Sequence, residues 1–296
     1  MAERDGGASA VPDEGALARQ MNDALRLVRD HISRETGNRF DDSALHILRR
    51  RLAARLPVLG LPDFYAYEHF LRAAPELARK AELDEIADRV TNHETYFFRE
   101  RYQLDAFSQH LLPRLAVDRA GSRRLAVWSA GCSTGEEVYT VAMLILESGL
   151  FAGWDVRVFG SDISREGLRS ARAAVYGPGS FRVTDEARME RWFDVADGKR
   201  RVKQELRDLC RFAQINLVDS EAASVLGAFD VVFCRNVLIY FDAESRRRVV
   251  STLERKLHAG GYLLLGHSEV LAPMTGELEL VHLPSDIVYR RLALSP

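Results

Sequence analysis

The stretch from Leu125 to Met143, LAVWSAGCSTGEEVYTVAM, constrains the fold more than any other part of the chain. The short apolar run Leu125–Trp128 is followed by small residues up to Gly135 and by a helical pattern from Glu136, which predicts a strand, a tight turn and a helix. Gly131 and Gly135 allow the backbone to turn sharply and to approach a ligand, and the start of the helix presents N–H groups. This pattern is typical of a nucleotide-binding turn.

The residues of this turn limit the nucleotide that it can hold. A P-loop would place a lysine where Glu136 and Glu137 stand, and two carboxylates would repel a triphosphate. A dinucleotide fingerprint, Gly-x-Gly-x-x-Gly, does not match, because the two glycines of the turn are four positions apart. The turn therefore favours a cofactor with a positive centre and no phosphates, such as S-adenosylmethionine. The alternative is an ordinary connection between a strand and a helix.

The composition is that of an ordinary globular protein. Of 296 residues, 47% are hydrophobic and 28% are charged, which suits one large domain and a smaller one. A formal net charge of −2 gives no overall attraction to nucleic acid or to anionic lipid. No apolar stretch approaches the roughly 20 residues that span a bilayer, and the three cysteines are widely spaced. We expect a cytoplasmic protein with free thiols that neither binds nucleic acid nor enters a membrane, and a disordered segment at residues 1–15.

The first part of the chain, residues 16–90, has the spacing of a small helical domain. Apolar residues recur three and four positions apart, as in Met21–Leu25–Val28–Ile32 and Leu45–Leu48–Leu52–Leu56. The second predicted helix also carries four arginines, Arg49, Arg50, Arg51 and Arg55. The last two lie one turn apart and flank the apolar stripe. Such a row is either a solvated face or a guide for an acidic partner surface.

Strand and helix patterns alternate through residues 121–296. Besides the central strand, we predict strands at residues 155–162, 209–216 and 229–235, helices at 165–174 and 243–257, a strand after a helix-terminating Gly260–Gly261 pair, and a closing hairpin over 278–292 around Pro284–Ser285. The less regular residues at about 176–206 indicate an insertion. The predicted fold class is therefore α/β, a mostly parallel sheet with helices on both faces, joined to the helical domain through residues 91–120.

An acidic residue ends the predicted strand at residues 155–162. In doubly wound sheets, a carboxylate at the end of the second strand commonly binds ribose hydroxyls, and Asp162 lies a little over 25 residues after Gly135. The alternative is an N-cap or turn aspartate, because a helix is predicted to begin shortly after it.

Four segments, in this order, resemble one family: VTNHETYFFRE (Val90–Glu100), VWSAGCSTGEEVYTVAM (Val127–Met143), FDVVFCRNVLIYFD (Phe229–Asp242) and GGYLLLGHSE (Gly260–Glu269). They are similar to the CheR family, the bacterial methyltransferases that esterify glutamate side chains of methyl-accepting chemotaxis receptors with S-adenosylmethionine. The resemblance implies a Rossmann-like methyltransferase domain at residues 121–296 with a small β insertion, a cofactor-covering segment at 91–120, and S-adenosylhomocysteine as product.

The resemblance also implies roles for individual residues. The implied cofactor-binding residues are His93, Thr95, Arg99, Glu137, Asp162, Asn216, Leu217, Arg235 and Asn236. The implied catalytic residues are Arg99 and Tyr240, the latter beside the transferable methyl group. Arg51 and Arg55 fall on the family's basic helix, which implies binding to the acidic receptor surface. No metal site is expected.

The sequence departs from the family pattern at two places. His93 stands where many members have asparagine, and a neutral imidazole can still donate or accept one hydrogen bond. The segment between Phe193 and Val202 is short compared with members that dock onto a C-terminal receptor pentapeptide. We therefore predict an enzyme that does not need the pentapeptide.

The expected chemistry needs no general base, because an ionised glutamate is already a nucleophile. Alignment of the reacting groups is then the main task of the enzyme. Arg99 and Arg235 are both candidates to hold the substrate carboxylate, and for Tyr240 the alternative is a half-buried aromatic packed in the core. We expect a monomer. Two other readings are a methyltransferase for another acidic or small substrate, and a signalling module that binds the cofactor without catalysis.

Overall fold

The computed structural model describes residues 14–271 and 277–292, which form two compact units. The chain passes from the first unit to the second at Val90, and Thr36–Asn38 also belong to the second unit. Helix α1 (Glu14–Thr36) begins inside the segment predicted to be disordered, whose earlier residues lie outside the described ranges. Within the described ranges, no helix is long and apolar enough to cross a membrane.

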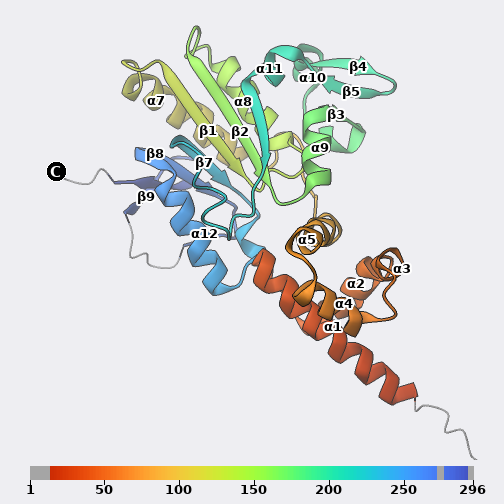
Figure 1. The fold of residues 1–296 in the computed structure, drawn as a ribbon. Coiled ribbons are helices and arrows are strands. Elements are labelled where there is room, and N and C mark those ends of the chain that lie inside the picture. The colour runs from red at the N-terminus through yellow and green to blue at the C-terminus, as the bar shows by residue number, and fades with distance from the viewer. Residues whose placement is uncertain (1–13, 272–276, 293–296) are drawn as a thin grey trace, which may run out of the picture. The chain divides into compact units, whose positions relative to one another are not determined.

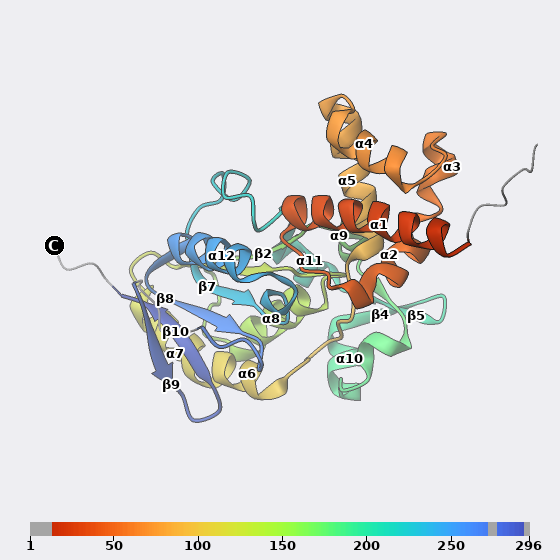
Figure 2. The ribbon, with the colours of Figure 1, turned by 90° about the horizontal axis from the view of Figure 1, so that it is seen from below.

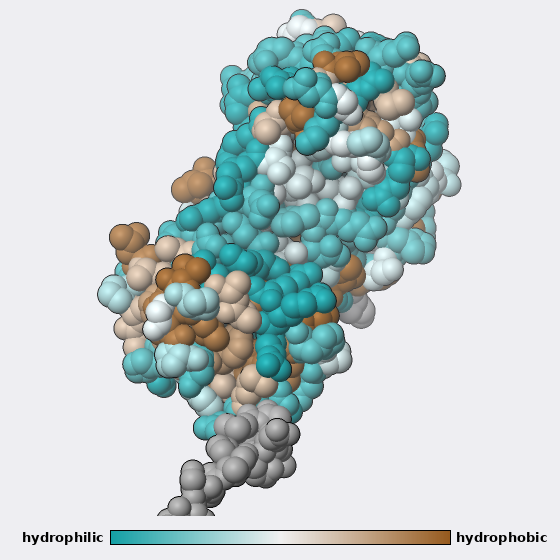
Figure 3. All heavy atoms as spheres, turned by 90° about the vertical axis from the view of Figure 1, so that its right-hand side faces the viewer, coloured by the Kyte–Doolittle hydropathy of each residue, from teal (hydrophilic) through white to brown (hydrophobic). Residues whose placement is uncertain are grey.

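The first unit is entirely helical, as the spacing of its apolar residues predicts. After α1 it contains α2 (Leu45–Leu52), α3 (Arg55–Leu59), α4 (Phe64–Ala73) and α5 (Glu76–Val90) (Figure 1). Leu25, Val28 and Ile32 are buried against Leu48 and Leu52, so both predicted stripes face one core. Figure 3 shows apolar side chains gathered on this unit, in the lower half of the view. A shallow groove of about 360 Å³ in this unit is lined by Leu61, just before α4, and by Phe70 and its neighbours on α4.

The prediction that one helix carries all four arginines is wrong. Helix α2 ends at Leu52, and Arg55 is the first residue of the separate helix α3. The physical reason is Pro57, which has no N–H and whose ring would meet the carbonyl of Ala53 if α2 continued. Arg49, Arg50 and Arg51 therefore share a helix, and Arg55 does not.

The second unit contains a mixed sheet of seven strands in the order β6-β2-β1-β7-β8-β10-β9. The strands are β1 (Arg124–Ala130), β2 (Asp155–Asp162), β6 (Cys210–Gln214), β7 (Phe229–Cys234), β8 (Leu257–Leu265), β9 (Leu278–His282) and β10 (Ile287–Arg291). The first five pair in parallel and the last two are antiparallel. The mostly parallel sheet is thus confirmed, and the predicted closing hairpin is β9–β10, whose turn is closed by Leu283 N–H donating to Asp286 O.

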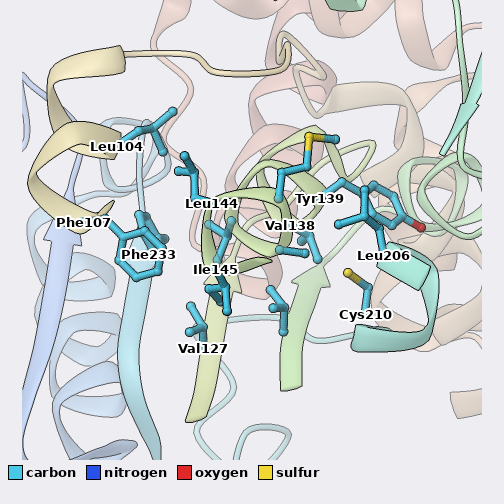
Figure 4. Packing of buried hydrophobic residues seen from close by; sticks show 14 of the residues in the cluster. Leu104, Phe107, Val127, Val138, Tyr139, Leu144, Ile145, Leu206, Cys210 and Phe233 are labelled. Carbon is cyan, nitrogen blue, oxygen red and sulfur yellow. The ribbon is translucent and has the colours of Figure 1, made fainter. Parts of the chain in front are cut away.

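Helices cover both faces of this sheet (Figure 2). On one face lie α6 (Arg101–Asp105), the π-helical turn η2 (Ala106–Leu111), α7 (Leu112–Asp118), α8 (Glu136–Ser148), α9 (Arg165–Ala173) and α11 (Gln204–Leu209). Figure 4 shows Phe107 against Phe233 and Ile145 near Val127 in this core. The other face packs against α12 (Ala243–Arg255). Strands buried on both faces explain the continuous apolar runs of β1 and β7.

The irregular segment before β6 forms a small β insertion, as predicted. It contains β3 (Val175–Tyr176), η3 (Pro178–Phe181), α10 (Glu186–Trp192), β4 (Phe193–Ala196) and β5 (Lys199–Val202), with strand order β3-β5-β4. The turn from β4 to β5 is the Asp197–Gly198 pair, and both residues have positive φ, as a two-residue hairpin requires. Phe97 packs on Tyr176, Phe181 and Phe193, so its role is core packing.

The prediction for Gly260–Gly261 is wrong. Helix α12 ends at Arg255, and the two glycines lie inside β8. Gly260 has a φ of +78°, and a Cβ on Gly261 would come within 3.0 Å of the carbonyl oxygens of His258 and Asp230. The pairing register between β7 and β8 shifts at this point. The glycines therefore serve a β-bulge rather than the end of a helix.

Candidate active site

The turn after β1 is shaped by glycines and by contacts with β2. Gly131 N–H and Cys132 N–H both donate to Ser161 O, at 2.7 and 2.8 Å. A Cβ on Gly131, whose φ is +81°, would lie 2.5 Å from Val237 Cγ2, and Gly135 has a φ of +94°. Both glycines are therefore required by the backbone, and the turn is a close-packed cradle at the carboxyl edge of the sheet, where ligands of open α/β folds bind.

Asp162 holds this cradle from the end of β2. Its two carboxylate oxygens accept the N–H groups of Ser133, at 2.8 Å, and Ser164, at 2.9 Å. The N-cap of α9 is Ser164, so Asp162 does not cap that helix, but its contact with Ser164 N–H, two residues on, is that of the turn aspartate that was the other alternative. Burial raises the pKa of this carboxyl, while both backbone hydrogen bonds oppose that shift. Each oxygen keeps a lone pair with which it can accept a ribose hydroxyl.

Arg235, at the end of β7, is enclosed by acceptors from three segments. Its Nη1 donates to Glu137 Oε2 at 3.0 Å, and its Nη2 donates to Arg99 O at 2.7 Å and to Glu100 Oε2 at 3.1 Å. Its Nε donates to Gln103 Oε1. The side chain is only 3% exposed. Arg235 therefore holds the site together, and it does not present its guanidinium to a substrate, which leaves Arg99 as the better candidate to orient the substrate carboxylate.

Glu137 and Asn236 are fixed by the same network. Glu137 accepts Ser129 Oγ–H at 2.7 Å as well as Arg235. Asn236 has a left-handed φ of +58°, and its Nδ2 donates to Glu100 Oε1 at 3.1 Å. Two of the predicted cofactor-binding residues are thus connected through Arg235 and Glu100, from helix α8 to the loop after β7.

The segment after Val90 lies against the cradle. One ring nitrogen of His93 is 3.3 Å from Ser133 Oγ and the other is 3.2 Å from Thr91 Oγ1. Arg99 donates from Nη1 to Glu94 O at 2.6 Å, and its side chain is partly exposed, as is that of Thr95. The imidazole of His93 therefore makes hydrogen bonds within the site, at the position where many members of the family have an asparagine.

Tyr240 faces outward from the loop after β7. It ends the short 3₁₀ turn η4 (Leu238–Tyr240) and is 41% exposed, whereas Leu238 and Phe241 are buried. Its hydroxyl oxygen accepts Asn92 Nδ2–H at 3.4 Å. Tyr240 is therefore not enclosed in the core, and its ring is accessible beside Asn92.

The other predicted site residues are Asn216 and Leu217, which follow β6, and Arg51 and Arg55, which belong to the helical unit. Leu217 is buried in the core under α12, and Asn216 is partly exposed beside it after β6. In the helical unit, Arg51 Nη1 donates to the carbonyls of Arg89 and Val90, both at 3.0 Å. Arg55 forms a bidentate pair with Glu82, whose side chain is 2% exposed. Arg51 thus holds the C-terminal end of α5, and Arg55 holds its middle.

Three residues of the site were not assigned from the sequence. They are Glu100, Gln103 and Ser133. Glu100 closes the VTNHETYFFRE segment and has a φ of +54°, and Ser133 has a φ of +50°; neither conformation has a signal in the residue type. The sequence signal that could have indicated Glu100 is its position within the VTNHETYFFRE segment, which resembles the family.

The cradle and its carboxylates fit an adenosyl cofactor. Gly131 provides the close approach, Asp162 provides acceptors for ribose hydroxyls, and the acidic groups Glu137 and Asp162 suit a ligand with a positive centre. No group of three or more His, Cys, Asp or Glu side chains in the described ranges could hold a metal ion. A mostly parallel seven-stranded sheet with such a cradle at its carboxyl edge is typical of the S-adenosylmethionine-dependent methyltransferases, and this is the class to which the chain belongs.

Comparison with known proteins identifies the family within that class. The family model "CheR methyltransferase, SAM binding domain" matches residues 93–287, and "CheR methyltransferase, all-alpha domain" matches residues 23–91. A relative from Vibrio cholerae, chemotaxis protein methyltransferase 2, is 34% identical over 82% of this chain and 84% of its own length. Chemotaxis protein methyltransferase 1 of Pseudomonas aeruginosa is 38% identical over 69% and 76%. The Salmonella typhimurium protein is 32% identical over 92% and 95%. The chain belongs to the CheR family of S-adenosylmethionine-dependent methyltransferases.

Proposed function

We propose that this chain transfers a methyl group from S-adenosylmethionine to glutamate side-chain carboxylates of bacterial chemoreceptors, giving glutamate methyl esters. The observation that carries the proposal is the match to named chemotaxis methyltransferases over both units of the chain. The products are the receptor ester and S-adenosylhomocysteine. We further propose that the enzyme acts as a monomer in the cytoplasm, where the receptor's signalling part is accessible.

In this proposal the residues of the chain bind and align rather than abstract a proton. When bound, S-adenosylmethionine supplies a methyl group on a positively charged sulfur, which a carboxylate oxygen can displace without a general base. Asp162 accepts the ribose hydroxyls, Arg99 orients the substrate carboxylate, and Tyr240 limits the space beside the transferred group. His93, Thr95, Asn216, Leu217 and Asn236 complete the cofactor site, which residues 91–120 cover. Such alignment supplies several kcal/mol of the barrier reduction, by the general estimate for oriented reactants.

The reaction is tested by the chemistry of its product. Membranes that contain chemoreceptors are incubated with the protein and with S-adenosylmethionine labelled in the methyl group, and the washed protein is treated with mild alkali. Release of the label as methanol is expected, because carboxyl methyl esters are base-labile. Label that stays on the receptor after alkali, or no transfer despite tight cofactor binding, would reject glutamate methylation.

Receptor recognition is proposed to use the exposed face of α2. His46, Arg49 and Arg50 are exposed and lie three and four positions apart, so they share one face, whereas Arg51 and Arg55 make contacts inside the unit. We propose that Arg49 and Arg50 contact the acidic receptor surface and that Arg51 and Arg55 support that face. The β4–β5 turn is a two-residue hairpin, which supports recognition without a receptor pentapeptide.

Substitution of both exposed arginines tests this assignment. The double variant R49A/R50A is expected to lower kcat/KM for receptor methylation roughly tenfold at low salt, because two charge contacts of about 0.5 to 1 kcal/mol each are lost. Its affinity for S-adenosylhomocysteine and its free energy of unfolding should not change. The comparison variant R55A is expected to destabilise the helical unit by about 3 kcal/mol, since it leaves Glu82 buried without its cation. An unchanged kcat/KM in R49A/R50A would reject α2 as the docking face.

A further inference from the structure

The loop that carries Asn236 and Tyr240 is held by a buried carboxylate from another strand end. Glu269 follows β8 and is 4% exposed. Its Oε2 accepts the N–H of Asn236 at 2.8 Å and its Oε1 accepts the N–H of Ile239 at 3.1 Å. One side chain therefore binds the backbone at both the beginning and the middle of this loop.

The turn after β8 is built to bring this carboxylate inward. Gly266 N–H donates to Glu269 Oε2 at 2.7 Å, and Glu269 N–H donates back to Gly266 O at 2.9 Å. A Cβ on Gly266 would lie 2.6 Å from Glu269 Oε2 and 2.7 Å from Asn236 N. Only glycine fits at this position while the carboxylate contacts the loop. The turn at Gly266 and the inward position of the Glu269 carboxylate therefore depend on each other.

The geometry of the loop requires such an anchor. Asn236 is held at a left-handed φ of +58°, a conformation that asparagine adopts more readily than most residues with a Cβ but that its local contacts must still fix. Its amide side chain is fixed separately by Glu100, at 3.1 Å. Cγ2 of Val237, the next residue, lies 2.5 Å from where a Cβ on Gly131 would be, so the loop also borders the cofactor cradle. A shift of Asn236 would move the cradle wall and Tyr240 together.

We propose that Glu269 is a positioning residue: its carboxylate fixes the Asn236–Tyr240 loop, through the backbone N–H groups of Asn236 and Ile239, in the position needed for cofactor binding and methyl transfer. It acts through this loop and does not itself touch the cofactor or the substrate. The inference rests on the proposed function for its catalytic part, and on the loop geometry alone for its part in cofactor binding.

The variant E269Q tests the role without a change of size. A glutamine has one acceptor oxygen and one NH₂ group, so it cannot accept N–H groups on both sides, and one of them would face a donor. Asp230 provides the control: it is a buried carboxylate at the opposite end of β7 that also accepts a backbone N–H, from Ala126 at 2.9 Å, and it pairs in addition with Arg119 at 2.6 Å. D230N, which also removes the charge that pairs with Arg119, should lower stability without affecting the loop.

Three measurements on the full chain separate the outcomes. In E269Q, hydrogen exchange of residues 235–240 should accelerate, affinity for S-adenosylhomocysteine should fall roughly tenfold, and kcat for receptor methylation should fall on the order of 100-fold, as expected for a misplacement of about 1 Å. In D230N, affinity and kcat should stay within about twofold of the wild type, as for substitutions far from a site. A loss of stability in E269Q with unchanged exchange of residues 235–240 and unchanged affinity would overturn the proposal.

Two further arms keep the test decisive. If E269Q does not fold, E269D keeps the charge but is one methylene too short to reach both N–H groups, and the same exchange and affinity changes are expected. If the wild type binds S-adenosylhomocysteine but methylates no receptor, the proposed function fails, while the exchange and affinity comparisons still decide the role of Glu269.

Discussion

Replacement of Asp162 by alanine should weaken binding of S-adenosylmethionine and S-adenosylhomocysteine by roughly 30- to 700-fold, or about 2 to 4 kcal/mol. The carboxylate accepts Ser133 N–H from the cradle and Ser164 N–H from the start of α9. Its loss removes the proposed ribose acceptor and also releases the turn that forms the cradle. Titration calorimetry with S-adenosylhomocysteine measures the effect directly.

Two companion variants make this result specific. D162N keeps the size of the side chain, but its NH₂ group must face one of the two backbone N–H groups, so an intermediate loss of affinity is expected. Asp155 lies at the opposite end of the same strand, where it pairs with Arg157 on the surface. D155A should therefore change the affinity by no more than about 0.5 kcal/mol. Unchanged affinity in D162A would remove Asp162 from the cofactor site.

The sequence predicts the strands of the second unit well because their patterns are local. Strand β2 has the predicted bounds, Asp155 to Asp162, and α8 begins at Glu136 as expected. Both follow from alternation, from the turn glycines and from the start of a helical stripe. The Gly260–Gly261 pair was misread because its cause is not local: the carbonyl oxygens of Asp230 and Phe229, on another strand, exclude a Cβ at Gly261.

The candidate site was predictable in position but not in its connections. The resemblance places Glu137, Arg235 and Asn236 at one edge of the sheet, where the topology brings them together. The partners of Arg235 lie far away in sequence, with Glu137 at 98 positions and Gln103 at 132. No periodicity connects residues at such separations. For this reason the sequence left Arg99 and Arg235 as equal candidates for the substrate carboxylate, and only the contacts of the guanidinium separate them.

The second large effect is expected at Arg235 itself. R235M should lower the free energy of unfolding by about 3 to 5 kcal/mol, because it leaves the carboxylates of Glu100 and Glu137 largely buried without a cation. R235K keeps the charge, but a single ammonium cannot match the planar fork that reaches four acceptors, so a loss of about 2 kcal/mol is expected. Urea denaturation measures both losses.

The same variants distinguish the two roles that the sequence left open for Arg235. If Arg235 held the substrate carboxylate, R235K would raise KM for the receptor and leave both the free energy of unfolding and the cofactor affinity unchanged. If Arg235 holds the site together, R235K should lose stability and cofactor affinity in parallel, because Glu137 and the segment at Arg99–Glu100 both lose their contact with the guanidinium. R188K is the control, because Arg188, on α10 of the β insertion, also pairs with a partly buried carboxylate: its Nε and Nη2 donate to the two oxygens of Glu147 on α8. It should lose stability and keep its cofactor affinity, which ties the loss of affinity in R235K to the position of Arg235 at the carboxyl edge of the sheet.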